Sequence, residues 1–258
     1  MSTDWILQTE ALTKEFKGFV AVNKVDLRVR RGTIHALIGP NGAGKTTCFN
    51  LLTKFLAPSA GRILFEGLDI TGEKPAQIAR RGVVRSFQIS AVFAHLSVLE
   101  NVRIALQRQL GTSYHFWKAE RSLHALDAEA MRLLALVDLE SYAAIPAVEL
   151  SYGRKRALEI ATTLAMDPKL MLLDEPTQGM GLEDVDRIRA LIKKVAASRT
   201  VLMVEHNMSV VASIADTITV LQRGATLAEG TYAEVSKDPA VIEAYMGSAQ
   251  TALAGAHG

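Results

Sequence analysis

Two kinds of apolar pattern alternate along the chain. Thr33–Ile38, Leu170–Leu173 and Thr200–Val204 are short, mostly apolar runs, and each is followed by glycine or a charged residue. Glu183–Ala197 instead places apolar residues at helical spacing, namely Val185, Ile188, Ile192 and Val195. Buried strands that alternate with amphipathic helices predict an α/β protein with a largely parallel sheet.

Two further regions, Leu7–Val29 and Gly61–Asp69, have the pattern of antiparallel strands. Each contains a turn signal, Lys17–Gly18 in the first and Glu66–Gly67 in the second. Lysine or glutamate followed by glycine between apolar runs is compatible with a tight turn. We therefore expect an antiparallel sheet beside the parallel one.

A helical block interrupts the α/β pattern between about residues 90 and 163. Its apolar residues recur at helical spacing, at Leu123, Leu126, Leu133, Leu134 and Val137. The Ala- and Gly-rich residues 248–258 lack such a pattern and are expected to form a disordered tail. We expect one domain over residues 1–247, with a helical subdomain at about 89–165.

Composition and charge narrow the classes of function. With 258 residues, 49% of them hydrophobic, the chain can bury one large core, or a core and a subdomain. Lysine and arginine total 29 against 27 acidic residues, whereas duplex-binding proteins usually concentrate basic residues in a stripe. The short basic runs at 28–31 and 80–81 are interpreted as solvated faces, and no nucleic-acid partner is expected.

No apolar run reaches the roughly 18 residues that a membrane-spanning helix needs, so we expect any membrane role to come through a partner. Met1–Phe16 also lacks the layout of a signal peptide. The single cysteine fits a reducing compartment. Cys48 lies in step with Leu51, Leu52 and Phe55, which predicts a core position on a helix; a catalytic thiol is the alternative.

The chemistry begins at a glycine-rich loop between a predicted strand and a predicted helix. It matches G-x-x-x-x-G-K-[ST] and comprises Gly39, Pro40, Asn41, Gly42, Ala43, Gly44, Lys45, Thr46 and Thr47. Such a loop turns backbone N–H groups towards phosphate at a helix N-terminus. Lys45 would reach the β- and γ-phosphates of a nucleotide, and the Thr46 hydroxyl would hold Mg²⁺. A chance glycine-rich turn is the competing interpretation, and the strand–helix context disfavours it.

A second half of the site follows the apolar strand at 170–173. Asp174 stands where a carboxylate can hold Mg²⁺, usually through water, and Glu175 can act as general base for an attacking water. Taken alone, Asp-Glu after four apolar residues would often be only a solvated turn. Together with the phosphate loop it predicts ATP hydrolysis.

The remaining motifs resemble those of the ABC ATPases, in the order that the family has them. Leu150–Arg154 resembles the signature loop, Phe16 falls where the adenine-stacking aromatic lies, and Gln88 matches the Q-loop glutamine. His206 matches the switch histidine. The resemblance extends from about residue 7 to 247, nearly the whole chain.

The resemblance implies roles for these residues. Gln88 and His206 would act beside Lys45 and Glu175 in catalysis, with Gln88 also near the metal. Ser151 and Gly153 would contact the γ-phosphate bound by another subunit, and Ser151 is expected to cap a helix that starts near Tyr152. Each residue also has a simpler interpretation. His206 could be a polar residue that is merely hydrogen-bonded, Gln88 a polar residue of the surface, and Ser151 an ordinary helix cap. For Phe16 the alternative is core packing, with Phe19 and Trp5 as competing aromatics.

The resemblance also implies a fold, partners and a location. We expect a P-loop NTPase core with a flanking antiparallel β-subdomain and an inserted α-helical subdomain, which is the ABC nucleotide-binding domain. It would use ATP and Mg²⁺ and pair with a second ATPase subunit, identical or paralogous. Transmembrane permease subunits, and indirectly a solute-binding protein, would complete the transporter. The chain would lie on the cytoplasmic side of the inner or plasma membrane, peripheral through the permeases.

Two departures point to one branch of the family. The signature has Tyr152 and Arg154 where glycine and glutamine are commonest, and Gly181 stands where an aspartate or asparagine often contacts the opposite phosphate loop. Together with residues 204–208 and 238–247, these two departures resemble the branch of the family that imports branched-chain and other hydrophobic amino acids. Importers of urea or amides are the alternative within this branch.

Two other classes remain as rivals. A soluble ABC ATPase of repair or translation would usually carry two cassettes or long inserted arms. A non-hydrolysing regulatory or structural cassette would lack the base or the switch residue, and here Glu175 and His206 are both present.

Overall fold

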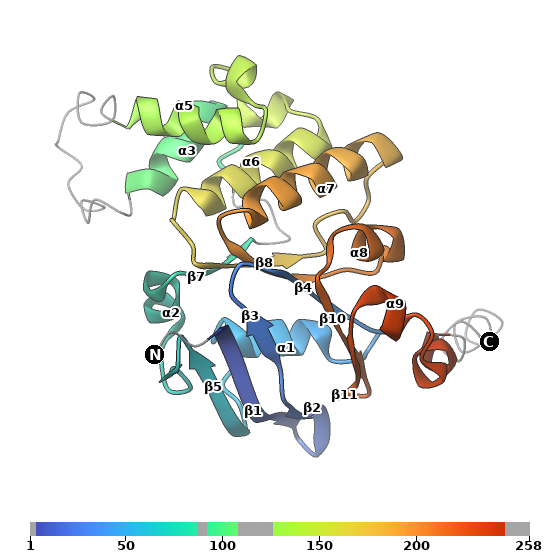
Figure 1. Ribbon diagram of the computed structural model, residues 1–258. Coiled ribbons are helices and arrows are strands. Elements are labelled where there is room, and N and C mark those ends of the chain that lie inside the picture. Colours follow the sequence, from blue (N-terminus) through green and yellow to red (C-terminus); the bar gives the residue numbers. More distant parts are fainter. Residues whose placement is uncertain (1–3, 87–91, 108–125, 246–258) are drawn as a thin grey trace.

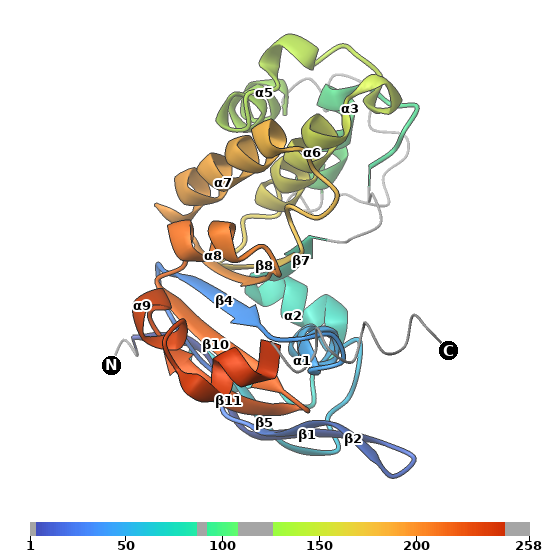
Figure 2. The same ribbon diagram turned by 90° about the vertical axis from the view of Figure 1, so that its right-hand side faces the viewer.

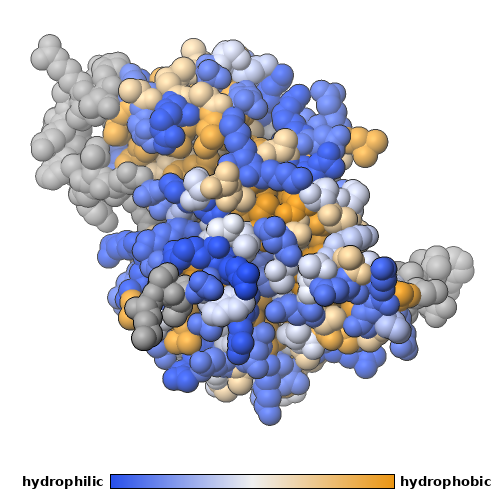
Figure 3. Space-filling view, in the orientation of Figure 1, coloured by the Kyte–Doolittle hydropathy of each residue, from blue (hydrophilic) through white to orange (hydrophobic). Residues whose placement is uncertain are grey.

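The computed structural model describes residues 4–86, 92–107 and 126–245. Two sheets lie one above the other, with helices between them and above the larger one (Figure 1). Most of the surface in view in Figure 3 is hydrophilic, which agrees with apolar side chains being gathered inside. None of the described helices is long and apolar enough to cross a membrane.

The larger sheet is the parallel one that the sequence predicts. Its spatial order is β11-β10-β4-β9-β8-β7, and only the β10–β11 pair is antiparallel. The strands are β4 (Ile34–Ile38), β7 (Val83–Ser86), β8 (Leu170–Asp174), β9 (Thr200–Val204), β10 (Thr217–Gln222) and β11 (Ala225–Gly230).

Side chains that alternate along the strands of this sheet pack into two separate cores. On β8, Leu170 and Leu172 join one core, whereas Met171 and Leu173 join the other. Successive residues of a strand point to opposite faces, so strands that are apolar throughout serve both cores. One core lies against α1 (Lys45–Leu52), between the two sheets (Figure 2). The other packs against α6 (Tyr152–Leu164), α7 (Leu182–Ala196) and α8 (Met208–Ile214).

The smaller sheet is antiparallel, as predicted. It comprises β1 (Trp5–Phe16), β2 (Phe19–Val25), β3 (Arg28–Arg30), β5 (Ala60–Phe65) and β6 (Leu68–Asp69). Both predicted turns are present: φ is 47° and 90° at Lys17–Gly18, and 51° and 79° at Glu66–Gly67. Two successive residues with positive φ are the mark of the type I′ turn, which matches the twist of a hairpin.

The helical part contains α3 (Val98–Gln107), α5 (Asp127–Leu136) and α6, which contact one another. Short 3₁₀ turns lie at Glu140–Tyr142 and Ala147–Glu149, and α2 (Pro75–Arg81) and α9 (Tyr232–Val235) lie elsewhere. Leu123 and the tail at 248–258 fall outside the described residues. The predicted boundaries of the helical subdomain and of the tail therefore stay predictions.

One residue of the predicted core stripe is misplaced. Cys48, Leu51 and Leu52 are fully buried on α1, but Phe55 is exposed. The helix ends at Leu52, and Lys54 has a φ of 62°, so the helical spacing does not continue to Phe55. Cys48 is fully buried, and burial raises the pKa of its thiol to about 12, so the alternative of a catalytic thiolate is disfavoured.

Candidate functional site

The polar residues of the site gather at one edge of the larger sheet. Gly39 follows β4, Asp174 ends β8 and Glu205 follows β9. These strands are parallel neighbours, so their carboxyl ends meet at the same edge, where open α/β sheets bind their ligands.

The glycine-rich loop has a backbone that other residues cannot adopt. Gly39 has a φ of +148°, and a Cβ there would collide with the carbonyl oxygen of Leu221. Gly44 has a φ of +100° and would collide with the carbonyl of Ala21. Gly44 is also the N-cap of α1 and has no side chain, so it leaves the first amides of that helix without a side-chain partner.

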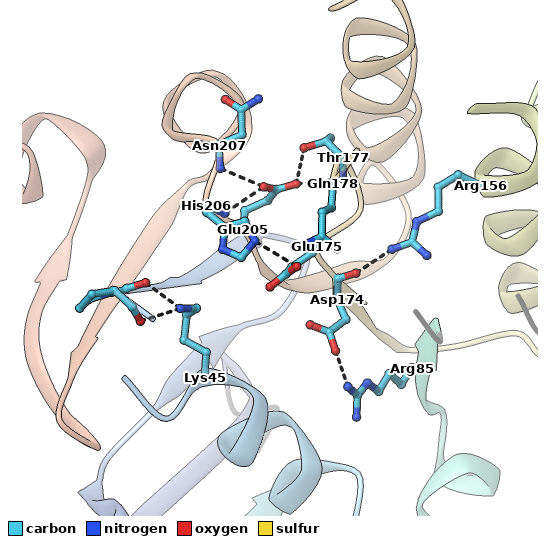
Figure 4. A network of polar contacts seen from close by, with 12 residues as sticks. Lys45, Arg85, Arg156, Asp174, Glu175, Thr177, Gln178, Glu205, His206 and Asn207 are labelled. Atoms are coloured by element: carbon cyan, nitrogen blue, oxygen red, sulfur yellow. Dashed lines mark hydrogen bonds and ion pairs between the residues drawn. The ribbon is translucent and has the colours of Figure 1, made fainter. Parts of the chain in front are cut away.

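Lys45 is folded back over this loop (Figure 4). Its Nζ donates to the carbonyl oxygens of Gly39 at 2.6 Å and Pro40 at 2.9 Å. Burial lowers the pKa of Lys45, and the negative charges of Glu175 and Asp174 oppose that shift. A buried ammonium whose hydrogen bonds go to loop carbonyls can exchange those acceptors for phosphate oxygens.

Asp174 is a deeply buried carboxylate of the site, with 1% of its surface exposed. Its Oδ2 accepts a hydrogen bond from Nη2 of Arg85, and its backbone oxygen accepts one from Nη2 of Arg156 at 2.6 Å. Its Oδ1 is buried and has no hydrogen-bond partner among the described residues. That oxygen is available to a cation. In the first turn of α1 the Thr46 side chain is exposed, and Gln88 lies outside the described residues.

Glu175 and His206 form a pair at the carboxyl ends of β8 and β9 (Figure 4). His206 Nε2 lies 3.0 Å from Glu175 Oε2, with side-chain exposures of 42% and 12%. Glu175 has a φ of 45°, a conformation rare outside glycine, and its N–H donates to the carbonyl of Val204 at 2.9 Å. The carboxylate is thus fixed beside the histidine and remains accessible to water.

Glu205 is a residue of the site that the sequence analysis did not single out. It is 1% exposed and accepts hydrogen bonds from Thr177 N at 3.0 Å and Thr177 Oγ1 at 2.5 Å. It also accepts from the backbone N–H groups of His206 at 3.0 Å and Asn207 at 3.1 Å. One carboxylate therefore holds together the loop after Glu175 and the loop that contains His206. The sequence signal that could have revealed Glu205 is its position, because it is a charged residue between an apolar strand and a histidine.

Replacing Glu205 by alanine is expected to destabilise the protein. Each buried donor that loses its acceptor costs roughly 1–3 kcal/mol, and the N–H of Thr177 is such a donor. The measurement is the urea denaturation midpoint, compared with that of Glu229→Ala, whose carboxylate accepts from Thr219 on the neighbouring strand. Equal midpoints for Glu205→Ala and the parent protein would contradict the bridging role.

Other predicted site residues lie as follows. Phe16 ends β1 and is 41% exposed, so core packing is not its role; Lys14 Nζ lies 5.1 Å from its ring centre. Ser151 is the N-cap of α6, as predicted, but its side chain makes no capping hydrogen bond. The expected cap is wrong in this respect, because backbone position alone does not orient the hydroxyl. Gly153 is buried, and a Cβ there would collide with the carboxylate of Asp184 on α7.

Comparisons with known proteins identify the family. The family model described as "ABC transporter" matches residues 22–178. The chain is 41% identical to the high-affinity branched-chain amino acid transport ATP-binding protein BraF of Pseudomonas aeruginosa, over 95% of this chain and 98% of that protein. The chain belongs to the ABC transporter family. It is also 38% identical to LivG of Escherichia coli K12, a protein with the same description, at the same coverage.

Solved cassettes have the same fold as this one. An ATP-binding cassette of an ABC transporter in its ADP conformation is 32% identical, with a TM-score of 0.84, over 95% of this chain and all of that one. A nucleotide-free cassette is 31% identical, with a TM-score of 0.82. A second family model, described as "Branched-chain amino acid ATP-binding cassette transporter", matches residues 225–250 of this cassette.

Membership of this family confirms the predicted fold class, an α/β nucleotide-binding cassette with an added antiparallel sheet and helices. It also confirms that the chain is an ATP-hydrolysing subunit of an ABC transporter, as the motifs predict. The rival interpretation, a soluble ABC ATPase outside transport, is thereby disfavoured.

Proposed function

We propose that this cassette powers the import of branched-chain and other hydrophobic amino acids by hydrolysing Mg-ATP. The single observation that carries hydrolysis is the Glu175–His206 pair, 3.0 Å apart beside the glycine-rich loop. The choice of solute is supported by the similarity to branched-chain amino acid transport ATP-binding proteins and by the family match at residues 225–250.

ATP is held in three places. The exposed ring of Phe16 stacks on the adenine, and the amides of the loop from Gly39 to Thr47 surround the phosphates. Lys45 exchanges the carbonyls of Gly39 and Pro40 for the β- and γ-phosphate oxygens, which are stronger acceptors because they are charged.

The donors present suit a magnesium ion. Asp174 offers one buried, unpartnered carboxylate oxygen, Thr46 offers an exposed hydroxyl on the first turn of α1, and Gln88 completes the proposed set. Mg²⁺ prefers such oxygen ligands together with waters and substrate phosphates. When bound, it would neutralise charge on the phosphate oxygens.

Glu175 is the general base in the proposed reaction. It takes a proton from water as the water oxygen bonds to the γ-phosphorus and the bond to the β,γ-bridging oxygen breaks. ADP and inorganic phosphate leave. His206 steadies the carboxylate of Glu175, and with Lys45 it stabilises the charge on the transferring phosphoryl group.

The proposed partners follow from the helix N-terminus at Ser151. There, Ser151 is the N-cap of α6 and Gly153 lies in its first turn, where the N–H groups of a helix N-terminus and the helix dipole favour a phosphate. We propose that this phosphate is bound by a second ATPase subunit, identical or paralogous, so that two chains enclose two ATP molecules. Permease subunits, served by a solute-binding protein, hold the pair on the cytoplasmic side of the membrane.

Reconstitution with the partners tests the proposed solute. The cassette, its co-expressed permeases and their solute-binding protein are placed in proteoliposomes, and ATP hydrolysis is followed with leucine, urea or acetamide. We expect leucine to stimulate hydrolysis and to be taken up, and urea and acetamide to do neither. The complex with Glu175→Gln is the matched control. Stimulation by urea alone would assign the cassette to the other importers of this branch.

A further inference from the structure

We propose that Tyr152 is a positioning residue, which holds the loop after Glu175 against the first turn of α6 and thereby raises the rate of ATP hydrolysis. The inference rests on the proposed role of Glu175 as general base. It concerns a residue that no step of the proposed reaction uses. Tyr152 is one of the departures from the family pattern, since glycine is commonest at its position in the signature.

The side chain of Tyr152 reaches from α6 to the loop between β8 and α7. Its hydroxyl donates to the carbonyl oxygen of Gln178 at 3.2 Å, and a Cβ built on Gly179 would lie 4.0 Å from the same hydroxyl. The next residue of α6, Gly153, is so close to α7 that a Cβ there would collide with the carboxylate of Asp184. The first turn of α6 is therefore packed against the start of α7, and Tyr152 extends this contact to the loop that leads into α7.

The backbone of Gln178 connects this contact to the general base. The N–H of Gln178 donates to the carbonyl oxygen of Glu175 at 3.1 Å, which closes the turn that begins at Glu175. The carbonyl of Gln178 accepts from Tyr152. Thr177, the residue before Gln178 in the same turn, is bound by Glu205 (Figure 4). Glu205 therefore fixes the first part of the loop, and Tyr152 fixes the part that follows.

Two glycines give that second part conformational freedom. Gly179 has a φ of +75°, and Gly181 is the N-cap of α7 without a side chain that could form a capping hydrogen bond. Glycine loses more conformational freedom on ordering than any other residue, so a loop with two glycines is costly to order. The hydrogen bond from Tyr152 offsets part of that cost. Without it, the turn at Glu175 loses one of its restraints.

The expected effect is moderate, because the contact is a neutral hydrogen bond on a side chain that is 61% exposed. The net contribution of such a bond corresponds to roughly a twofold to tenfold change in an equilibrium. The proposed ATP-binding side chains of Lys45 and Phe16 lie on other elements, α1 and β1. A lower kcat at an unchanged KM is therefore the result that a positioning role predicts. A purely structural role would instead lower the melting temperature.

The test compares Tyr152→Phe, which removes only the hydroxyl, with the parent chain. We expect hydrogen–deuterium exchange of the amides at 178–182 to become faster and kcat for ATP hydrolysis to fall roughly twofold to tenfold. The KM for ATP and the melting temperature should not change. Tyr142→Phe is the matched control, because it removes the hydroxyl of a tyrosine whose ring contacts Arg154 of the same helix, α6. It should alter neither the exchange nor the rate.

A second substitution should restore what Tyr152→Phe loses. Gly181 has a φ of −70°, which serine adopts readily, and a Cβ built there meets no described atom within 4 Å. Gly181→Ser therefore reduces the freedom of the loop without strain, and its hydroxyl can cap α7. Combined with Tyr152→Phe, it should bring both the exchange and kcat back towards the values of the parent chain.

The outcomes separate this inference from the proposed function. If Tyr152→Phe leaves either the exchange at 178–182 or kcat unchanged, the inference is overturned, and the proposed role of Glu175 stands. A lower melting temperature with a raised KM would make Tyr152 a structural residue and would overturn the inference as well. If Glu175→Gln kept full turnover, the proposed general base would be wrong, and the inference would fail with it.

Discussion

Replacing Glu175 by glutamine is expected to remove nearly all ATP turnover while ATP still binds. An amide cannot accept the proton of the attacking water, and losing a general base costs on the order of 10²–10⁴-fold in rate. Glutamine keeps the size of the side chain, and its amide oxygen can still accept from His206, so the fold should persist. Phosphate release and binding of a fluorescent ATP analogue measure the two effects separately.

The same variant should form a stable pair of chains. If hydrolysis is what separates two cassettes around ATP, then Glu175→Gln with saturating ATP and Mg²⁺ should elute as a dimer in gel filtration. Glu183→Gln is a matched control, because that carboxylate lies on the surface of α7 with 90% of its side chain exposed. A monomeric profile for Glu175→Gln would count against the enclosed pair of nucleotides.

A second large effect is expected when two inactive chains are mixed. Lys45→Ala and Ser151→Arg should each abolish activity, because in the proposed pair every site needs Lys45 from one chain and Ser151 from the other. In a mixed pair one site retains both intact residues, so partial activity should return. Phosphate release is measured for each chain alone and for the mixture at the same total concentration.

Dilution gives an independent check of that arrangement. A site shared between chains makes activity per chain fall on dilution, by mass action. Activity per chain that stays constant over a wide dilution range, together with no recovery on mixing, would show that each chain hydrolyses ATP alone. Ser151 would then be only the first residue of its helix.

The parts of this site that sequence reasoning found are those fixed by local structure. The glycine-rich loop needs positive φ at Gly39 and Gly44, and the two hairpin turns need it at Gly18 and Gly67. Such conformational requirements are recognisable from a few adjacent residues in the sequence. Apolar runs likewise predicted the buried strands, because both faces of β8 and β9 are covered.

The contacts that were not predicted join residues far apart in the chain. Arg85 and Asp174 are 89 positions apart and meet only because β7 lies beside β8. Glu205 and Thr177 are 28 positions apart and meet through the order of β8 and β9. Local spacing can also mislead. Phe55 was predicted to lie on the core face of the helix, but α1 ends at Leu52, so the helical spacing does not reach Phe55.

The hydrogen bond from Arg156 to the backbone oxygen of Asp174 has a mechanical consequence. Arg156 lies on α6 and is also tied to Glu159 of the same helix, 2.6 Å away, so it moves with that helix. If α6 tilts against the sheet, it must either pull the end of β8 along or break a charged hydrogen bond worth about 1.5–3 kcal/mol. The residue after Asp174 is Glu175, the proposed general base. Through the single side chain of Arg156, a tilt of α6 is therefore transmitted to Asp174, which is adjacent to the proposed general base in the chain.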